Sequence, residues 1–297
     1  MKVGIFGAGY SGREIGKRLA DTGTPVWGTS RNDGHFDSLT KQNITPAVFD
    51  GETLTDETLS HLKESTHLII SIAPPRIECA GKLVDPTLIA LEGALSTLAP
   101  KLEWVGYLST VGVYGNHDGA WVDEAIPATP ASERSRQRVR AEQEWLAVGD
   151  ELTIPVGIFR LAGIYGPGRN ALINATNGTS RRMVKKDQVF NRIHVGDIAE
   201  ALKLATIQKS NGLFNITDDE PAPPQDVVIL AHSLIGVVPP PEIDFETADI
   251  TPMGRSFYGE NKRVSNIKSK EVLGLEYAWP NYRVALMRMW EKNDWLG

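Results

Sequence analysis

Hydrophobic and polar positions in the first half of the chain form two kinds of segment, which alternate along the sequence. Short, nearly continuous apolar runs alternate with longer stretches in which apolar residues recur at helical spacing. Continuous apolar runs are typical of parallel strands covered on both faces, and their alternation with helices predicts a doubly wound α/β sheet of the Rossmann type. We expect strands at the start of the chain and at residues 25–29, 44–49, 66–72, 104–108, 155–161 and 213–216.

Capping and turn residues place the helices between these strands. The first helix is expected to end at Gly23, where a glycine suits the residue after a helix. Asp85 is a good capping residue, and Pro86 suits the first helical position, so we expect a helix from there to about Leu98. The charged residues 132–148 predict another helix.

The second half of the chain is less regular. Residues 166–168 break the pattern with two glycines and a proline. Residues 192–195 then predict a return to the sheet, and residues 197–199 the start of a new helix. Prolines cluster after residue 221, which is typical of short helices and loops.

This change in pattern predicts two structural units. The dinucleotide-binding domain comprises residues 1–165 and 194–217. A smaller C-terminal substrate-binding lobe comprises residues 166–193 and 218–297. In such folds ligands bind outside the carboxyl ends of the strands, so we expect the substrate in the crevice between domain and lobe.

A glycine-rich turn follows the first strand and opens the first helix. Gly7, Gly9 and Gly12 form a G-x-G-x-x-G pattern in the strand–turn–helix context that gives it meaning. Gly7 allows a sharp turn, Gly9 lets a pyrophosphate approach the backbone, and Gly12 lets the helix pack close to the strand. The free N–H groups at the helix start, from Tyr10 and Ser11 onward, then face the phosphates. The turn predicts a dinucleotide cofactor.

The end of the second strand indicates which dinucleotide is bound. An acidic residue near this point favours the ribose hydroxyl of NAD, and an arginine favours the 2′-phosphate of NADP. Here Ser30 and Arg31 follow the strand, without Asp or Glu at its end. Because the guanidinium is a planar fork of donors suited to phosphate, we predict NADP(H). The alternative is that Arg31 is an ordinary surface residue.

The amino-acid composition narrows the class of protein and its expected partners. The 297 residues are 41% hydrophobic and 23% charged, with a net charge of −6, which disfavours a nucleic-acid partner. The single cysteine, Cys79, excludes an internal disulfide and a cysteine-based zinc site, and we expect no metal. Without a signal peptide or an apolar run of membrane-spanning length, we expect a cytoplasmic protein with no membrane partner.

Further motifs continue along the chain in a fixed order. With the glycine turn they make the sequence resemble the extended short-chain dehydrogenase/reductases, the NAD(P)-dependent epimerase/dehydratase group, over nearly its whole length. The motifs are Asp50 and residues 108–115, 159–168, 193–199 and 214–216. The resemblance implies that Asp50 lies near the adenine, that Ala73 and Pro74 line the cofactor, that Ser109 belongs to its site and that Gly163 borders the nicotinamide.

The chemistry of that family depends on a tyrosine and a lysine four residues apart on one helix face. The matching positions here hold Arg134 and Arg138, and no tyrosine occurs between residues 120 and 159. Arginine does not give up its proton near neutral pH. The sequence therefore resembles the atypical subgroup that lacks these active-site residues.

Three other side chains are candidates for the chemistry. Thr110 occupies the family's hydroxyl position and either bonds a substrate carbonyl or alcohol or satisfies the loop backbone. Tyr114 and Tyr165 are candidate replacement acids, if a nearby cation lowers the phenol pKa; the alternative is aromatic packing. His194 resembles a structural strand-end residue.

Basic residues in the inserted segment suggest an acidic or phosphorylated substrate, with a solvated surface as the alternative. They are Arg169, Arg181, Arg182, Lys185, Lys186 and Arg192. Phe190 stands where nucleotide-sugar enzymes often carry a pyrophosphate-binding arginine, which weakens the case for a sugar nucleotide.

Three functions follow as hypotheses. The first is an NADP(H)-dependent oxidoreductase acting on a small, anionic carbonyl or alcohol. The second is a cofactor-binding sensor or regulator without turnover, and the third is a sugar epimerase or dehydratase. The charged helix at residues 132–148 suits a solvated face better than an apolar interface, so we expect a monomer or weak homodimer.

Overall fold

Seven parallel strands form the central sheet, as the apolar runs predict. The structure is a computed structural model that describes residues 1–75 and 83–297. In spatial order the strands are β3 (Ile44–Val48), β2 (Val26–Ser30), β1 (Val3–Phe6), β4 (His67–Ile70), β5 (Trp104–Thr110), β7 (Val156–Leu161) and β11 (Gly212–Ile216). The order reverses direction between β1 and β4, so the predicted doubly wound α/β fold is confirmed.

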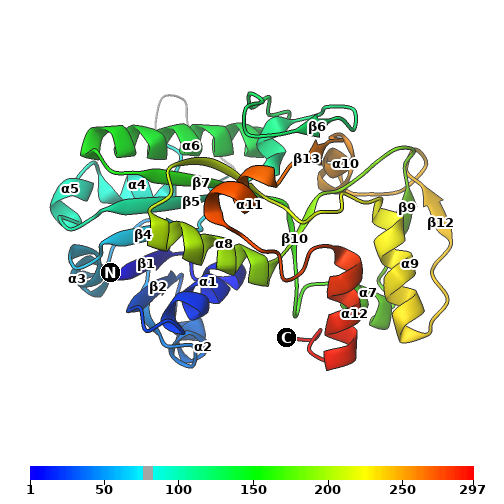
Figure 1. Cartoon of the computed structure of the whole chain (residues 1–297), viewed down its shortest axis with the longest axis horizontal. Helices are drawn as coiled ribbons and strands as arrows, with labels where there is room; N and C mark the ends of the chain where they lie inside the picture. Colours follow the sequence, from blue (N-terminus) through cyan, green and yellow to red (C-terminus); the bar gives the residue numbers. More distant parts are fainter. Residues whose placement is uncertain (76–82) are drawn as a thin grey trace.

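Helices cover both faces of this sheet (Figure 1). On one face are α1 (Tyr10–Ala20) and α8 (Val195–Gln208), which pack on each other and on side chains such as Ile5. The opposite face buries Phe6 and carries α3 (Asp56–Lys63), α4 (Pro86–Leu91), α5 (Leu95–Leu98) and α6 (Glu133–Leu152). The short α2 (Phe36–Thr40) follows the 3₁₀ turn η1 (Asp33–His35) and packs beside β3.

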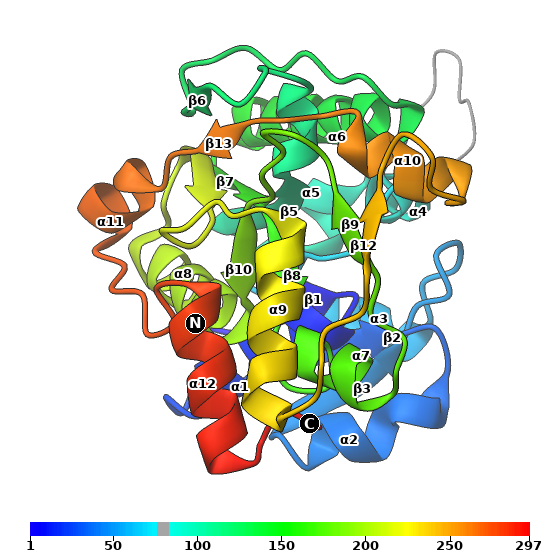
Figure 2. The same ribbon diagram turned by 90° about the vertical axis from the view of Figure 1, so that its right-hand side faces the viewer.

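The C-terminal part of the chain builds a smaller unit beside the sheet. Its core is formed by α7 (Ala171–Thr176), α9 (Pro224–Ile235) and α12 (Tyr282–Lys292), with α9 and α12 side by side in Figure 2. Among the described residues, two small parallel sheets connect this unit to loops at the carboxyl edge of the main sheet. They pair β8 (Gly163–Tyr165) with β10 (Arg192–His194) and β6 (Trp121–Val122) with β13 (Arg263–Val264). A third small sheet, β9 (Arg182–Val184) with β12 (Glu242–Asp244), lies within the unit, where β9 packs on α9.

Two expectations about secondary structure are wrong. The helix that Asp85 caps ends at Leu91, because Glu92 and Gly93 both adopt positive φ angles, of 48° and 74°. A second short helix, α5, then begins at Leu95. Residues 192–195 do not return to the main sheet, because the strands beside β7 are β5 and β11, and β10 pairs with β8 instead.

The division into domain and lobe stays a prediction, and some residues pack across it. Helix α11 (Ile267–Leu273) lies against α8 and β11. Leu273 and Leu275, which we place in the lobe, are buried in the core between α1, α8 and the sheet. Helix α10 (Pro252–Tyr258) and the segment after it lie near the start of α6 instead.

Candidate functional site

The glycine turn has the geometry that its sequence predicts. Gly7 has a φ of +88°, and a Cβ there would lie 2.8 Å from the side chain of Ile72. At Gly12 a Cβ would lie only 2.4 Å from the carbonyl oxygen of Gly7. At Gly9 a Cβ would have no neighbour within 4 Å. The first and third glycines are therefore needed by the turn itself, whereas the second leaves open space beside the backbone.

The start of α1 offers backbone donors to that space. Thr29 fixes the turn, since its Oγ1 accepts from the N–H of Gly7 at 2.9 Å and its carbonyl accepts from Ala8 at 2.8 Å. In the part of the chain that the structure describes, the N–H groups of Tyr10, Ser11 and Gly12 have no hydrogen-bond acceptor. The first turn of α1 also contains no acidic residue. These residues fit the diphosphate of a dinucleotide.

The side chain of Tyr10 points to a different partner. Its hydroxyl donates to the carbonyl of Pro167 at 2.9 Å, and the Arg169 guanidinium lies 5.9 Å from its ring centroid. Burial raises the pKa of the phenol to about 12. The side chain of Tyr10 therefore links the glycine turn to the loop after β8, and only its backbone N–H faces the open space beside Gly9.

The residues predicted to hold the ribose and adenine follow β2 and β3. Ser30 donates its hydroxyl hydrogen to the carbonyl of Asn32, and Arg31 between them is exposed. Asp50 accepts from the N–H groups of Glu52 and Thr53, at 2.9 and 2.8 Å, and these bonds lower its pKa. The Asp50 carboxylate shapes its own turn at the edge of the sheet.

Three predicted cofactor residues follow the neighbouring strands. Ala73 is exposed and Pro74 is buried, both just after β4. Gly163 is exposed at the start of β8, and its N–H donates to the carbonyl of Asn191 at 3.0 Å. Because parallel strands end at the same edge of a sheet, these residues and the glycine turn share the carboxyl edge.

The two arginines that we match to the family's catalytic pair both have partners. Arg138 donates to the carbonyl of Leu108 at 2.7 Å and to the Tyr107 hydroxyl at 3.2 Å. Arg134 is exposed, and its guanidinium lies 5.4 Å from the ring centroid of Phe257, on α10. Arg138 therefore stabilises β5, and Arg134 contacts the C-terminal segment.

Thr110 serves the loop and still has a hydrogen to donate. Its Oγ1 accepts from the N–H of Gly112 at 3.1 Å and caps the 3₁₀ turn η2 (Val111–Tyr114). Among the described residues nothing accepts the hydroxyl hydrogen. The two alternatives for Thr110 are thus compatible, because accepting from the loop leaves the O–H able to bond a substrate oxygen.

A buried polar network lies beneath Thr110. The Ser109 hydroxyl donates to Glu142, whose carboxylate forms an ion pair with Arg160 at 2.7 Å. The guanidinium of Arg160 lies 4.8 Å from the Tyr114 ring centroid, and the Tyr114 hydroxyl donates to Asn215 at 2.8 Å. The charged helix at residues 132–148 was expected to present a solvated face, and for Glu142, which is 3% exposed, this is wrong.

The network favours the packing alternative for Tyr114. Burial raises the pKa of its phenol, and Arg160 only partly offsets this. The lowered pKa that a replacement acid needs is therefore absent, and the buried ring belongs to the packing around Arg160. The sequence does not reveal this network because its members come from five separate elements, β5, η2, α6, β7 and β11.

Tyr165 and His194 form a second buried aromatic cluster. Their rings are edge to face at 5.4 Å, and His194 stacks on Trp279 at 4.2 Å. Burial raises the pKa of Tyr165 and lowers that of His194 to about 3. The Nδ1 of His194 accepts from the N–H of Gly196 and caps α8, which agrees with its expected structural role. For Tyr165, too, a lowered pKa is contradicted.

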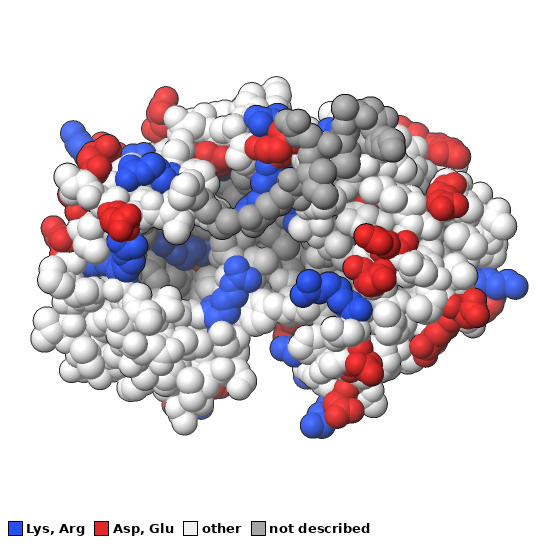
Figure 3. Space-filling model, turned by 180° about the vertical axis from the view of Figure 1, so that it is seen from behind, with Lys and Arg blue, Asp and Glu red and all other residues white. Residues whose placement is uncertain are grey.

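The basic residues of the inserted segment are divided among several contacts. Arg182 pairs with Glu242, and Arg181 and Lys185 donate to backbone carbonyls of the segment around α10. Arg192 donates to the carbonyls of Phe190 and Ala222. Seen from behind, the molecule is hollowed in the middle, and Lys and Arg side chains gather at the hollow (Figure 3).

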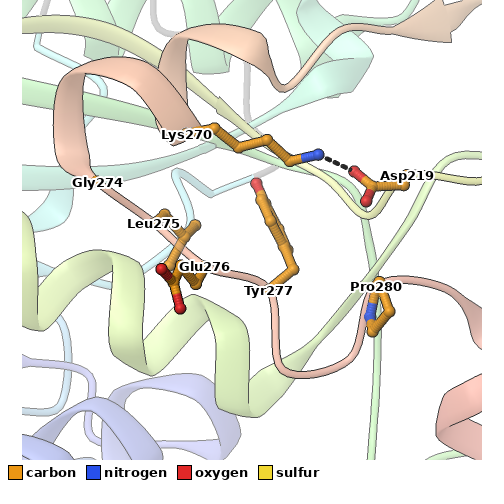
Figure 4. Close-up of a pocket in the computed structure, with 7 residues that line it drawn as sticks. All are labelled: Asp219, Lys270, Gly274, Leu275, Glu276, Tyr277 and Pro280. Atoms are coloured by element: carbon orange, nitrogen blue, oxygen red, sulfur yellow. Dashed lines mark hydrogen bonds and ion pairs between the residues drawn. The ribbon is translucent and has the colours of Figure 1, made fainter.

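Two cavities lie away from this edge, beside α8 and α11. One, of about 420 Å³, is lined by Asp219, Lys270 and Tyr277 among others, with Lys270 paired to Asp219 at 2.6 Å (Figure 4). The other, of about 330 Å³, adjoins it and includes Arg18 and Trp279. Neither includes a residue of the glycine turn, so neither is the predicted cofactor site.

Among residues 1–75 and 83–297, no helix combines the length and apolar character needed to cross a bilayer. Within the same ranges no group of His, Cys, Asp and Glu side chains is arranged to hold a metal ion.

The sheet order, the glycine turn and the donors of α1 define a dinucleotide-binding α/β protein. Comparison with known proteins then shows the family to which the chain belongs. Residues 4–217 match the model of the NAD dependent epimerase/dehydratase family, and the chain belongs to that family. The predicted resemblance is confirmed, and with it a fold that binds nicotinamide dinucleotides.

Individual relatives agree with this assignment. Protein YeeZ of Escherichia coli K12 is 24% identical, and the match covers 94% of this chain and 97% of that one. A functionally unknown conserved protein from Silicibacter pomeroyi has a solved structure that is 45% identical, with a TM-score of 0.88 over 98% of each chain. The fold is also that of dTDP-glucose 4,6-dehydratase from Bacillus anthracis in complex with NAD (18% identity, 99% and 97% coverage, TM-score 0.75).

Proposed function

We propose that the protein is an NADP(H)-binding oxidoreductase acting on a small, anionic carbonyl or alcohol without the family's usual tyrosine and lysine. The observation that carries the proposal is the glycine turn, where Gly9 leaves open space before the free N–H groups of α1. Arg31, exposed after β2, supports the phosphorylated cofactor over NAD(H).

Each part of the site has a separate task in this proposal. The turn at Gly7–Gly12 and the start of α1 hold the diphosphate, and Ser30 with Arg31 holds the 2′-phosphate. Ala73, Pro74 and Gly163 line the cofactor along the sheet edge. The bound nicotinamide supplies the hydride chemistry. The free hydrogen of the Thr110 hydroxyl bonds and orients the substrate oxygen.

The Lys and Arg side chains that gather at the hollow in Figure 3 support an anionic substrate. A separate observation concerns Arg134. Arg134 is exposed where the family has its catalytic tyrosine, and it lies over Phe257 from the C-terminal segment. A guanidinium in this place suits a carboxylate or phosphate. Phe190 packs edge to face on Tyr258 at 5.1 Å, so no arginine for a sugar nucleotide stands at that position. This disfavours the sugar epimerase or dehydratase hypothesis.

One observation favours a second candidate, a cofactor-binding sensor or regulator without turnover. Arg138 is bound to the backbone of β5, so the helix face that carries the chemistry in the family serves structure here. A sensor needs the cofactor site but no proton donor. It predicts that NADPH changes an association of the protein, which light scattering with and without NADPH detects.

The oxidoreductase is tested by turnover. NADPH-loaded protein is mixed with a panel of aldehydes, keto acids and imines, and the loss of NADPH absorbance is followed. We expect turnover with one acidic member of the panel. Silence across the panel, together with a change in mass on NADPH binding, would favour the sensor instead.

We also infer a cytoplasmic protein that is a monomer or weak homodimer. The Glu144 carboxylate on α6 accepts from the N–H groups of Val84 and Asp85, so part of this helix carries the chain's own segment. Light scattering at micromolar concentration is expected to give the monomer mass of about 32.5 kDa. A stable dimer mass would overturn the inference.

A further inference from the structure

Lys262 is a buried charged residue to which the proposed function assigns no role. Its side chain is 6% exposed, although lysine is rarely buried unless paired. The ammonium donates to the carbonyl of Gly115 at 2.7 Å and to the carboxylate of Glu260 at 2.6 Å. An ammonium has three hydrogens, and among the described residues only these two acceptors bind it.

The hydrogen bonds of Lys262 reach the two loops that carry Thr110 and Gly163, the residues assigned to the nicotinamide end. Gly115 closes the turn η2 that Thr110 caps. On the other side, the backbone carbonyl of Lys262 accepts from the Asn191 side chain at 2.9 Å, and the carbonyl of Asn191 accepts from the N–H of Gly163 at 3.0 Å. Lys262 thus connects the loop after β5 with the start of β8.

A contribution to folding stability does not by itself explain why a lysine and its carboxylate partner are buried at this position. Buried ion pairs add little to stability compared with apolar residues of similar size, because both charges lose their hydration. Burial lowers the pKa of the Lys262 ammonium, and Glu260 only partly offsets this. A lysine in such surroundings releases its proton more readily than one in water.

We propose that Lys262 is the catalytic residue that gives the substrate oxygen its proton in place of the missing tyrosine. This role rests on the proposed function. As the carbonyl carbon gains a hydride from the reduced cofactor, which becomes oxidised, the carbonyl oxygen gains the proton from Nζ. The products are an alcohol and a neutral amine, which takes a proton back from solvent. In the alcohol-oxidising direction the amine accepts that proton.

Other titratable groups lie close to Lys262. Glu260 is on its own segment, and His117, in the loop after η2, bonds the carbonyl of Tyr114 at 2.9 Å. Lys185 donates to the carbonyl of Tyr258, two residues before Glu260. A measurement must therefore follow the Lys262 ammonium itself rather than a bulk pH profile.

The test compares the Lys262 pKa in two cofactor complexes of the full chain. Lysine ¹³Cε signals are followed against pH with NADP⁺ and with NADPH, and the Lys262 signal is assigned by its loss in Lys262→Met or, if that variant does not fold, Lys262→Arg. The nicotinamide is positive only in NADP⁺, so a nearby ammonium has a lower pKa there, by about one unit. Lys270, in the distant cavity, is the control and shows no difference between complexes.

Turnover supplies the second readout, on whichever panel carbonyl the wild type reduces. Lys262→Met and Lys262→Arg are both expected to lose about 100-fold in kcat while keeping their affinity for NADPH, because arginine restores the charge but not the proton. Full rescue by arginine, or the same Lys262 pKa in both complexes, overturns the catalytic role alone. Failure of both cofactors to bind overturns the proposed function, and this role falls with it.

Discussion

Arg138 of α6 donates a 2.7 Å hydrogen bond to the backbone carbonyl of Leu108, in strand β5. The sequence-based prediction matches its position to the lysine that holds the ribose and activates the tyrosine in the family. Here the side chain turns to the strand and also contacts the hydroxyl and ring of Tyr107. The helix face that usually performs the chemistry therefore supports the sheet.

Removing the Arg138 side chain is predicted to affect stability more than cofactor binding. Arg138→Met loses the bond to Leu108 and the contact with Tyr107, which costs about 1–2 kcal/mol of unfolding free energy. Urea denaturation measures this, with Arg136→Met on the same helix as the exposed control. Unchanged stability with a tenfold loss of NADPH affinity would instead give Arg138 the family lysine's role.

The buried pair of Glu142 and Arg160 is predicted to be the most sensitive point of the sheet edge. Glu142→Ala leaves the guanidinium buried without its partner and costs about 3–5 kcal/mol. The double variant Glu142→Leu/Arg160→Met removes both charges and should recover much of that loss. Glu133→Gln, which breaks an exposed pair, is the control. Equal effects of Glu142→Ala and Glu133→Gln on the urea midpoint would refute a structural role for the network.

Gly9 is predicted to serve the cofactor and not the fold. Because a Cβ at this position has no neighbour within 4 Å, Gly9→Ala should unfold at the wild-type temperature. The methyl group enters the space left for the diphosphate, so NADPH affinity should fall at least about tenfold. Gly12→Ala is the contrasting variant, since its Cβ meets the Gly7 carbonyl and lowers the melting temperature. Wild-type affinity in Gly9→Ala would place the diphosphate elsewhere.

The buried Asp218 carboxyl is predicted to make the folding stability of the protein depend on pH. Burial raises its pKa to about 8, well above the value near 3.9 of an unfolded aspartate. Folding therefore retains a proton that the unfolded chain releases, and stability falls as pH rises from about 4 to 8. Asp218→Asn removes this dependence, so its stability relative to wild type should rise by about 3 kcal/mol between pH 5 and pH 8.

Asp21 provides the control for that experiment, because it is exposed and paired with Lys17. The stability difference between Asp21→Asn and wild type should stay constant from pH 5 to pH 8 in urea titrations. A flat difference for Asp218→Asn as well would mean that the Asp218 carboxyl ionises in the folded protein as readily as in water.

Local sequence patterns predicted the sheet well, because apolar runs and glycine positions depend on near neighbours. Asp85 caps its helix as expected, with bonds to the N–H groups of Thr87 and Leu88. The break at Glu92 was missed because glutamate is an ordinary helix former, and only its positive φ angle reveals the turn.

The site was less predictable because its side chains meet over long sequence separations. Tyr10 bonds Pro167, 157 residues away, and Lys262 bonds Gly115, 147 residues away. No spacing rule brings such pairs together. The pKa values of Tyr114 and Tyr165 also depend on burial more than on the nearest cation, which their sequence neighbourhood does not reveal.

The central claim is that the glycine turn and Arg31 form an NADP(H) site. Calorimetric titration of the wild-type protein with NADPH and with NADH tests it most directly. We predict that NADPH binds about tenfold tighter or better, and that Arg31→Ala abolishes the preference while Arg288→Ala, on the distant α12, retains it. NADH binding as tightly as NADPH, or more tightly, would contradict the claim.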